Sequence, residues 1–239
     1  MASDDVPSTP ALDRRSFLKA TGTGGTLAVA ATAGCTDLRA ADRDDVVLSP
    51  PEGYDEDVAA ELPHPTYGDE VPEVTIPAPL ADREVTTTDF VGERHSLYTF
   101  LFTRCSSACP GLMANLVHVQ ADSLEEGYAD DVTLCPVTFD PEHDTPEVLA
   151  AYEEDHGVDD DAGNWYTLRP ETPAAATDVV DDTFGVTFAE TDDADGMAFM
   201  HTNLVLVVNE GGHVERAYTG DVPTPADVVD DVRTLLEEW

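Results

Sequence analysis

Basic residues are scarce in this chain of 239 residues, and lysine is nearly absent. Eleven lysines and arginines stand against 50 aspartates and glutamates, which gives a formal net charge of −39. The sequence has no basic stripe that could neutralise the phosphates of a nucleic acid, so a nucleic-acid partner is excluded. Negative charges in such excess repel one another in dilute salt, whereas molar salt shortens the Debye length to about 3 Å. The composition therefore predicts the surface of a halophile's protein. The excess of acidic residues is evidence about the salt content of the medium and not about a substrate.

A long hydrophobic run is missing as well. The apolar stretch Ala20–Ala33 is too short and too mildly apolar for a good membrane span, and it follows a twin-arginine pattern at Asp13–Lys19. Gly34 and Cys35 come next and resemble a lipoprotein cleavage site. We predict that residues 1–34 are a twin-arginine export signal. Cleavage before Cys35 would leave a lipid-modified cysteine on the outer face of the cell membrane; the alternative is a free cysteine in a cleaved leader.

The segment after the signal has little periodicity. Residues 35–69 are rich in aspartate, glutamate and proline, which is typical of an extended linker. We therefore predict an acidic tether at 35–69 and a folded domain at 70–239. Its roughly 170 residues are enough for one well-buried core.

Strand and helix patterns alternate through the folded part. An apolar and aromatic run predicts a buried strand at 95–103, and a helix at 110–126 and a strand at 132–139 follow it as a βαβ unit with parallel strands. Thr145 and Pro146 predict the start of the next helix. Further strands are expected at 71–76, 85–90, 164–168, 186–189, 201–208 and 213–219, and further helices at 172–183 and 225–239. This order predicts a thioredoxin-like α/β sandwich with a central mixed sheet flanked by helices.

Two cysteines lie where the first buried strand gives way to a helix. Cys105 and Cys109 are four residues apart, and Pro110 is suited to the first turn of a helix. Free backbone N–H groups and the helix dipole favour thiolates at such a junction. At this offset the Cα atoms lie roughly 6 Å apart, which a disulfide tolerates. The pair is therefore suited to a soft metal or to a dithiol–disulfide cycle, and a structural disulfide is the simpler alternative.

Four features in order along residues 70–239 resemble the Sco/SenC family. They are a strand followed by Cys105-x-x-x-Cys109-Pro110, then Asp140-Pro141-x-x-Asp144-Thr145, then Trp165 in a W-x-L segment, and then His201 before the Gly211-Gly212 turn. The family consists of exported thioredoxin-fold proteins that bind copper and help to assemble the copper centre of cytochrome c oxidase. The resemblance implies copper ligands at Cys105, Cys109 and His201. It also implies a partner, the copper-binding subunit of a terminal oxidase.

The chain departs from the family between the cysteines. Ser106 stands where the family often has a proline, and Ser107 and Ala108 replace the family's aspartate. The donor set itself still suits copper, because two thiolates and an imidazole are soft ligands that favour Cu(I) and also accommodate Cu(II). Zinc in a structural site usually takes four protein ligands, and no comparable fourth ligand is near in the sequence.

Other residues near these motifs have simpler interpretations. Cys135 lies inside an apolar run and is expected to be a buried small hydrophobic residue. Met197 and Met200 flank His201 and are expected to pack, with transient thioether ligation as the alternative. Asp140 and Asp144 are expected to be turn and cap residues, with partner docking as the alternative. The remaining histidines are expected to be solvated: His64, His95, His118, His143, His156 and His213.

Two classes of function fit this sequence best. The first is a membrane-tethered copper metallochaperone with dithiol character, which could also act as a thiol-disulfide reductase. The second is a thiol enzyme, either a thiol-disulfide oxidoreductase or a peroxiredoxin-like thiol peroxidase. Thioredoxins use a two-residue spacer and a cis-proline, whereas this chain has a three-residue spacer and Met200-His201 at the corresponding place. A disulfide-stapled lipoprotein that only binds a partner is a third alternative.

Overall fold

The computed structural model describes residues 45–190 and 199–239. The predicted signal region 1–34, Cys35 and Met197 lie outside the described residues. Within the described ranges, no helix combines the length and the apolar character that crossing a membrane requires.

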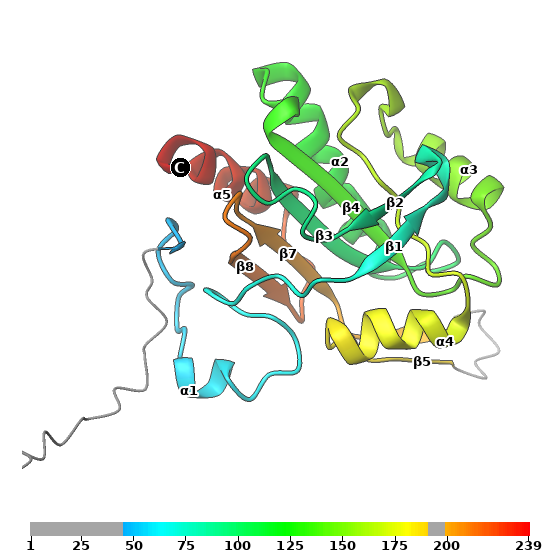
Figure 1. Cartoon of the computed structure of the whole chain (residues 1–239), viewed down its shortest axis with the longest axis horizontal. Coiled ribbons are helices and arrows are strands. Elements are labelled where there is room, and N and C mark those ends of the chain that lie inside the picture. Colours follow the sequence, from blue (N-terminus) through cyan, green and yellow to red (C-terminus); the bar gives the residue numbers. More distant parts are fainter. Residues whose placement is uncertain (1–44, 191–198) are drawn as a thin grey trace, which may run out of the picture. The chain divides into compact units, whose positions relative to one another are not determined.

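A four-stranded mixed sheet forms the centre of the domain, in the order β4–β3–β7–β8 (Figure 1). Strand β3 (His95–Leu101) runs parallel to β4 (Val132–Thr138) and antiparallel to β7 (Leu204–Val208), and β7 pairs antiparallel with β8 (Val214–Thr219). Helix α2 (Cys109–Glu126) connects β3 to β4. The predicted parallel βαβ unit and the late antiparallel hairpin are therefore both confirmed.

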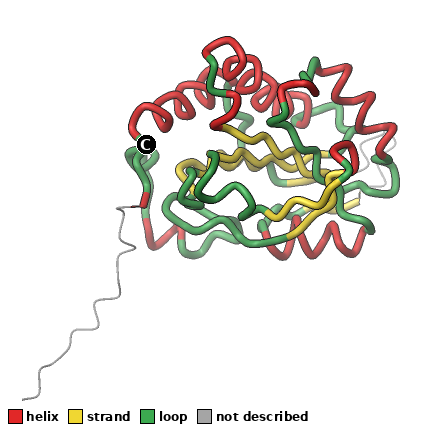
Figure 2. Tube along the Cα trace, turned by 45° about the horizontal axis from the view of Figure 1, so that its top comes forward, coloured by secondary structure: helices red, strands yellow, loops and turns green. Residues whose placement is uncertain are grey.

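Helices lie on both sides of this sheet, as Figure 2 shows. Helices α2 and α5 (Pro225–Glu238) lie on one side and are joined by an ion pair between Asp122 and Arg233. On the other side, α4 (Pro173–Ala176) continues into the π-helical η6 (Thr177–Thr183). The remaining elements are α1 (Glu56–Ala59), β1 (Thr75–Ala78), η3 (Pro79–Ala81), β2 (Arg83–Thr86), η4 (Ala129–Asp131), α3 (Pro146–His156), η5 (Asp160–Ala162), β5 (Phe188–Glu190) and β6 (Phe199–His201).

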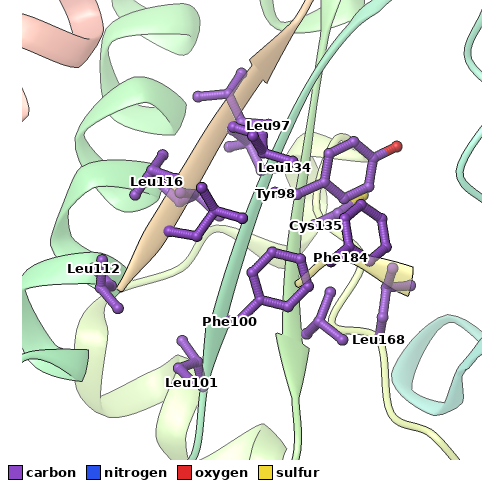
Figure 3. Close-up of a cluster of buried hydrophobic side chains, with 14 of the residues drawn as sticks. Leu97, Tyr98, Phe100, Leu101, Leu112, Leu116, Leu134, Cys135, Leu168 and Phe184 are labelled. Atoms are coloured by element: carbon purple, nitrogen blue, oxygen red, sulfur yellow. The ribbon is translucent and has the colours of Figure 1, made fainter. Parts of the chain in front are cut away.

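The central strand β3 has apolar neighbours on both faces. On one face Leu97 and Leu101 lie on the side of Leu116 and Leu112 of α2 (Figure 3). On the other face Phe100 packs against Phe184, with ring centroids 4.9 Å apart. Side chains alternate between the faces of a strand, so a strand covered on both sides carries apolar residues at successive positions, as Leu97 and Tyr98 and then Phe100 and Leu101 do here. This explains why the sequence predicts β3 as one continuous apolar run.

The predicted single strand at 201–208 is wrong, because the chain forms two strands there. Strand β6 ends at His201 and pairs with β5, whereas β7 begins at Leu204 and belongs to the central sheet. Two polar residues separate them. The Thr202 N–H donates to Thr187 at 3.0 Å, and the Asn203 side chain donates to the Gly220 carbonyl at 2.8 Å. These bonds redirect the backbone, so His201 lies at the end of a small separate hairpin.

The first described residues pack against the domain. The N–H groups of Val47 and Leu48 donate to the two carboxylate oxygens of Glu215, at 2.9 and 3.0 Å, and the Tyr67 hydroxyl donates to the Leu48 carbonyl at 2.6 Å. Leu48 and Tyr67 are buried. The packed part of the chain therefore begins well before residue 70, within the segment that the sequence assigns to a tether. Isolated apolar residues in an acidic background form no period, so the sequence pattern does not reveal this docking.

Candidate metal centre

The two cysteines lie at the carboxyl end of β3, where the chain turns into α2. Cys109 is the first residue of α2, and Cys105 belongs to the loop before it. No side chain caps α2 at Ala108; instead the Cys109 N–H donates to the Cys105 sulfur at 3.4 Å. The first N–H groups of a helix have no partner within the helix, so here a sulfur takes the place of a capping oxygen. The Ser107 hydroxyl lies 3.5 Å from the same sulfur.

His201 reaches this junction from the end of β6. Its Nε2 atom lies 3.3 Å from the Cys109 sulfur, and its Nδ1 atom lies 3.2 Å from the Thr202 carbonyl oxygen. A carbonyl can only accept, so Nδ1 carries the proton and Nε2 keeps a lone pair that can ligate a metal ion. A backbone carbonyl that fixes the tautomer in this way is a common partner of metal-ligating histidines. The imidazole is held against Phe139, with ring centroids 5.1 Å apart.

The structure brings the three predicted site residues together. One ligand atom from each of Cys105, Cys109 and His201 lies within 4.8 Å of the other two. Both cysteines are buried and free of disulfides, and His201 is half-buried. The set is therefore compact enough to hold one metal ion, while the histidine side remains open to solvent. Two thiolates and one imidazole offer the soft donors and low coordination number that Cu(I) prefers.

The two thiols have very different proton affinities. The Cys109 thiol donates to the Cys105 sulfur, and the Ser107 hydroxyl and the Cys109 N–H add further hydrogen bonds, so the pKa of Cys105 falls to about 3 although burial opposes the shift. The same hydrogen bond and burial raise the pKa of Cys109 above its ordinary value. The pair therefore holds one thiolate, stabilised on Cys105, and one shared proton.

The loop after β4 holds the cysteine loop in place. The backbone N–H of Thr103 donates to Asp144 at 3.2 Å, and the hydroxyls of Thr103 and Thr138 donate to the same carboxylate. Asp140 forms an ion pair with Arg104, which directly precedes Cys105. These contacts go beyond the turn and cap roles expected for the two aspartates. Sequence reasoning missed Thr103 and Arg104; the available signal was that the carboxyl ends of parallel strands meet at one edge of the sheet.

A second group of ligand atoms belongs to the framework of this site. Asp140, His143 and Asp144 also bring one ligand atom each within 4.8 Å of the others. Their carboxylates are already engaged by Arg104 and by threonine hydroxyls, and His143 lies 3.1 Å from Asp144. The group therefore supports the loop next to the cysteines and offers no free donor set.

The other residues singled out from the sequence lie away from the ligand atoms. Met200 is 64% exposed, and it lies between Phe199 and His201 on β6, so it points to the opposite face of the strand. Cys135 is fully buried in the middle of β4, as expected for a small hydrophobic residue. The expectation of a solvated side chain is wrong for His95, which is 3% exposed; its Nδ1 atom accepts a hydrogen bond from the Glu210 N–H at 3.0 Å.

The fold and the site together define a thioredoxin-like α/β protein with a Cys–Cys–His ligand set at the carboxyl end of its central strand. Residues 80–237 match the SCO1/SenC family model, so the chain belongs to the SCO1/SenC family. A curated relative, the SCO1 protein homolog of Bacillus subtilis strain 168, is 25% identical over 139 residues, which are 58% of this chain and 69% of the relative.

Solved structures of the family share this fold. The structure of Arabidopsis thaliana ScoI with copper bound is 18% identical, has a TM-score of 0.55, and the match covers 72% of this chain and 99% of that one. The structure of BsSco is described as showing a disulfide switch in a member of the Sco family of cytochrome c oxidase assembly proteins. It is 23% identical with a TM-score of 0.55, and the match covers 72% of this chain and 97% of that one. The predicted thioredoxin-like fold class is thereby confirmed.

Proposed function

We propose that this protein is a copper metallochaperone that binds the ion through Cys105, Cys109 and His201 and delivers it during assembly of a cytochrome c oxidase. The observation that carries the proposal is the convergence of three soft ligand atoms within 4.8 Å of one another, from a loop, a helix terminus and a separate hairpin. Family membership supports copper as the cargo, and the oxidase role described for BsSco supports the partner. The partner would be the oxidase's copper-binding subunit.

The surroundings of the site favour transfer over permanent storage. Copper would meet a fixed Cys105 thiolate and a fixed imidazole, because backbone groups at Cys109 and Thr202 hold both in place. One side of the site is open at His201, which is half-buried. An acceptor could therefore approach from the imidazole side and exchange ligands one at a time. Low coordination numbers suit such exchange, since an incoming ligand finds an unoccupied direction.

Copper titration of the full chain, reduced and in molar salt, tests the proposal. We expect one equivalent of Cu(I) in competition with a chelator, and with Cu(II) a thiolate-to-copper absorption band. His201→Ala should weaken Cu(I) binding by more than about tenfold, since it removes a ligand rather than a supporting group. Cys135→Ala is the matched control: it removes a buried sulfur that lies outside the ligand set. Unchanged copper affinity in His201→Ala, or equal losses in both variants, would contradict the three-ligand site.

A second candidate is favoured by the free dithiol. The Cys105 thiolate could attack a partner's disulfide to form a mixed disulfide, and Cys109 could then attack Cys105. The partner would leave with two thiols, this chain would keep a Cys105–Cys109 disulfide, and an external dithiol would be needed to reduce it again. Rapid exchange with a disulfide peptide in a chain that binds no copper would favour this reductase over the chaperone.

We further propose that the protein works outside the cell membrane in a saline medium. The twin-arginine pattern before residue 34 and the Gly34-Cys35 pair support export and lipid anchoring, and the net charge of −39 supports adaptation to high salt. Mass spectrometry of the protein from its native membrane tests the anchor. A lipid-modified N-terminus at Cys35 is the expected result, and an unmodified chain that begins elsewhere would overturn it.

A further inference from the structure

A cleft lies beside α3, on a part of the molecule that the proposed function does not use. Its volume is about 390 Å³, and none of Cys105, Cys109 and His201 lines it. Four short elements or segments contribute to its wall: η3, α3, η5 and the segment that follows η5. The lining residues include Ala150, Glu153, Asp160, Trp165, Tyr166 and Thr167.

Glu153 is the unusual member of this lining. Its side chain comes from α3 and is only 5% exposed. One carboxylate oxygen, Oε1, accepts from the Trp165 indole N–H at 3.1 Å and from the Thr167 hydroxyl. Within residues 45–190 and 199–239, no group donates a hydrogen bond to the second oxygen, and no cation forms an ion pair with the carboxylate. A buried carboxylate without a cation is costly, so its presence at a cleft calls for a ligand.

The nearby arginines do not supply that cation. Arg83 lies over the Tyr166 ring, 5.3 Å from its centroid, and forms an ion pair with Asp89 at 3.2 Å. Arg94 donates to the Gly163 carbonyl at 3.5 Å. Both guanidinium groups are thus engaged at the border of the cleft.

Burial raises the pKa of Glu153, and the negative charge of Asp160 adds to this effect, while the hydrogen bonds from Thr167 and Trp165 oppose it. A positive charge inside the cleft would favour the ionised carboxylate and would at the same time be attracted by it. The raised pKa and the unpaired carboxylate oxygen of Glu153 therefore both indicate a cationic ligand.

We propose that this cleft binds an organic cation, an alkylammonium group, with its charge on Glu153 and its carbon chain against the Trp165 ring. The indole ring offers the carbon chain an apolar surface, and a cleft of about 390 Å³ has room for a chain of several carbons. A metal ion fits less well. Among the described residues, the groups of three metal-ligating side chains include neither Glu153 nor Asp160. The ammonium group belongs either to a small free amine or to a lysine side chain of a partner.

Tryptophan fluorescence can report on the cleft directly. The chain has two tryptophans, and Trp239 at the C-terminus is exposed. The full-length Trp239→Phe chain therefore leaves Trp165, in the cleft wall, as the single reporter. The probe is n-butylammonium chloride, titrated against sodium chloride at constant ionic strength, with 1-butanol as the uncharged control. We expect a saturable change in Trp165 emission with the ammonium salt only.

Two variants separate charge from shape. Glu153→Gln keeps an oxygen for Trp165 and Thr167 but removes the charge, and it should raise the Kd for butylammonium at least about tenfold. Ala150→Leu, on an exposed position of α3, should fill the cleft and weaken binding even if the Gln variant folds poorly. N-acetyl-lysine amide then distinguishes the sources. Binding comparable to butylammonium points to a partner's lysine, and binding of butylammonium alone points to a small amine.

The proposal is overturned if butylammonium causes no saturable change, if 1-butanol acts equally well, or if Glu153→Gln and Ala150→Leu both bind as the parent does. None of these results would bear on copper binding, because the cleft and the Cys–Cys–His site share no residue.

Discussion

The two ends of β3 both bury polar groups, and they treat them in opposite ways. At the amino end, Glu215 receives the N–H groups of Val47 and Leu48 and the Asn209 side chain. At the carboxyl end, the neighbours of Cys105 and Cys109 lie 3.3 to 3.5 Å from the two sulfurs, and the hydrogen bonds there stabilise an ionised Cys105. Full hydrogen bonding stabilises the fold at one end. At the other end, a thiolate and an imidazole lone pair remain available to a metal ion.

The largest effect on stability should come from a change at the amino end of β3, where the buried polar groups are fully hydrogen-bonded. Glu215→Ala leaves two backbone N–H groups and the Asn209 amide without their acceptor, and we expect it to lower the free energy of unfolding by about 4 kcal/mol. Chemical denaturation in molar salt measures this. Copper affinity should stay within about twofold of the parent, because the ligand atoms lie at the opposite end of the strand.

Glu215→Gln is the matched control for this change. It keeps one accepting oxygen but not two, so its free energy of unfolding should lie between those of the parent and of Glu215→Ala. If Glu215→Ala unfolds as the parent does, the docked segment from residue 45 contributes nothing to stability, and the contrast between the two ends is lost.

The cysteine end of β3 should show the reverse pattern. Cys109→Ser replaces a soft ligand with a hydroxyl, and we expect Cu(I) affinity to fall at least about 100-fold, or about 2.7 kcal/mol. The free energy of unfolding should change by less than about 1 kcal/mol, because the serine hydroxyl can still donate to the Cys105 sulfur. Competition with a chelator and denaturation of the same sample give both values. A large loss of stability with unchanged copper affinity would make Cys109 a structural residue.

A smaller effect on stability concerns His95, at the amino end of β3. Burial lowers the pKa of His95 from 6.5 to about 4, although Asp131 opposes the shift. Above pH 6.5 the histidine is neutral in both states. As the pH falls below 6.5, His95 binds a proton in the unfolded chain but not in the folded chain, so the folded state loses stability.

His95→Asn removes this titration but keeps an acceptor for the Glu210 N–H. Between pH 7 and pH 5, we expect the parent to lose about 2 kcal/mol more of its free energy of unfolding than the variant loses. Denaturation curves at constant salt measure the difference. Parallel pH profiles for the two chains would show that His95 is accessible to protons in the folded state.

Local patterns were enough to predict the main architecture. The apolar run of β3, the proline after Cys109 and the Thr145-Pro146 start of α3 each depend on residues close in sequence, and each prediction is confirmed. The strand pattern failed at Thr202 and Asn203. There the backbone changes direction through hydrogen bonds to Thr187 and Gly220, which no local period reveals.

The sequence by itself determined the βαβ unit, the cysteine junction and the acidic surface, because spacing, propensity and charge are properties of neighbouring residues. Only the tertiary structure decided which distant groups meet. It brought His201 to Cys109 across 92 positions, Glu215 to Val47 across 168, and Glu153 to Trp165 in the wall of a cleft. Such contacts depend on how the sheet and its hairpins pack, and local sequence patterns do not predict that packing.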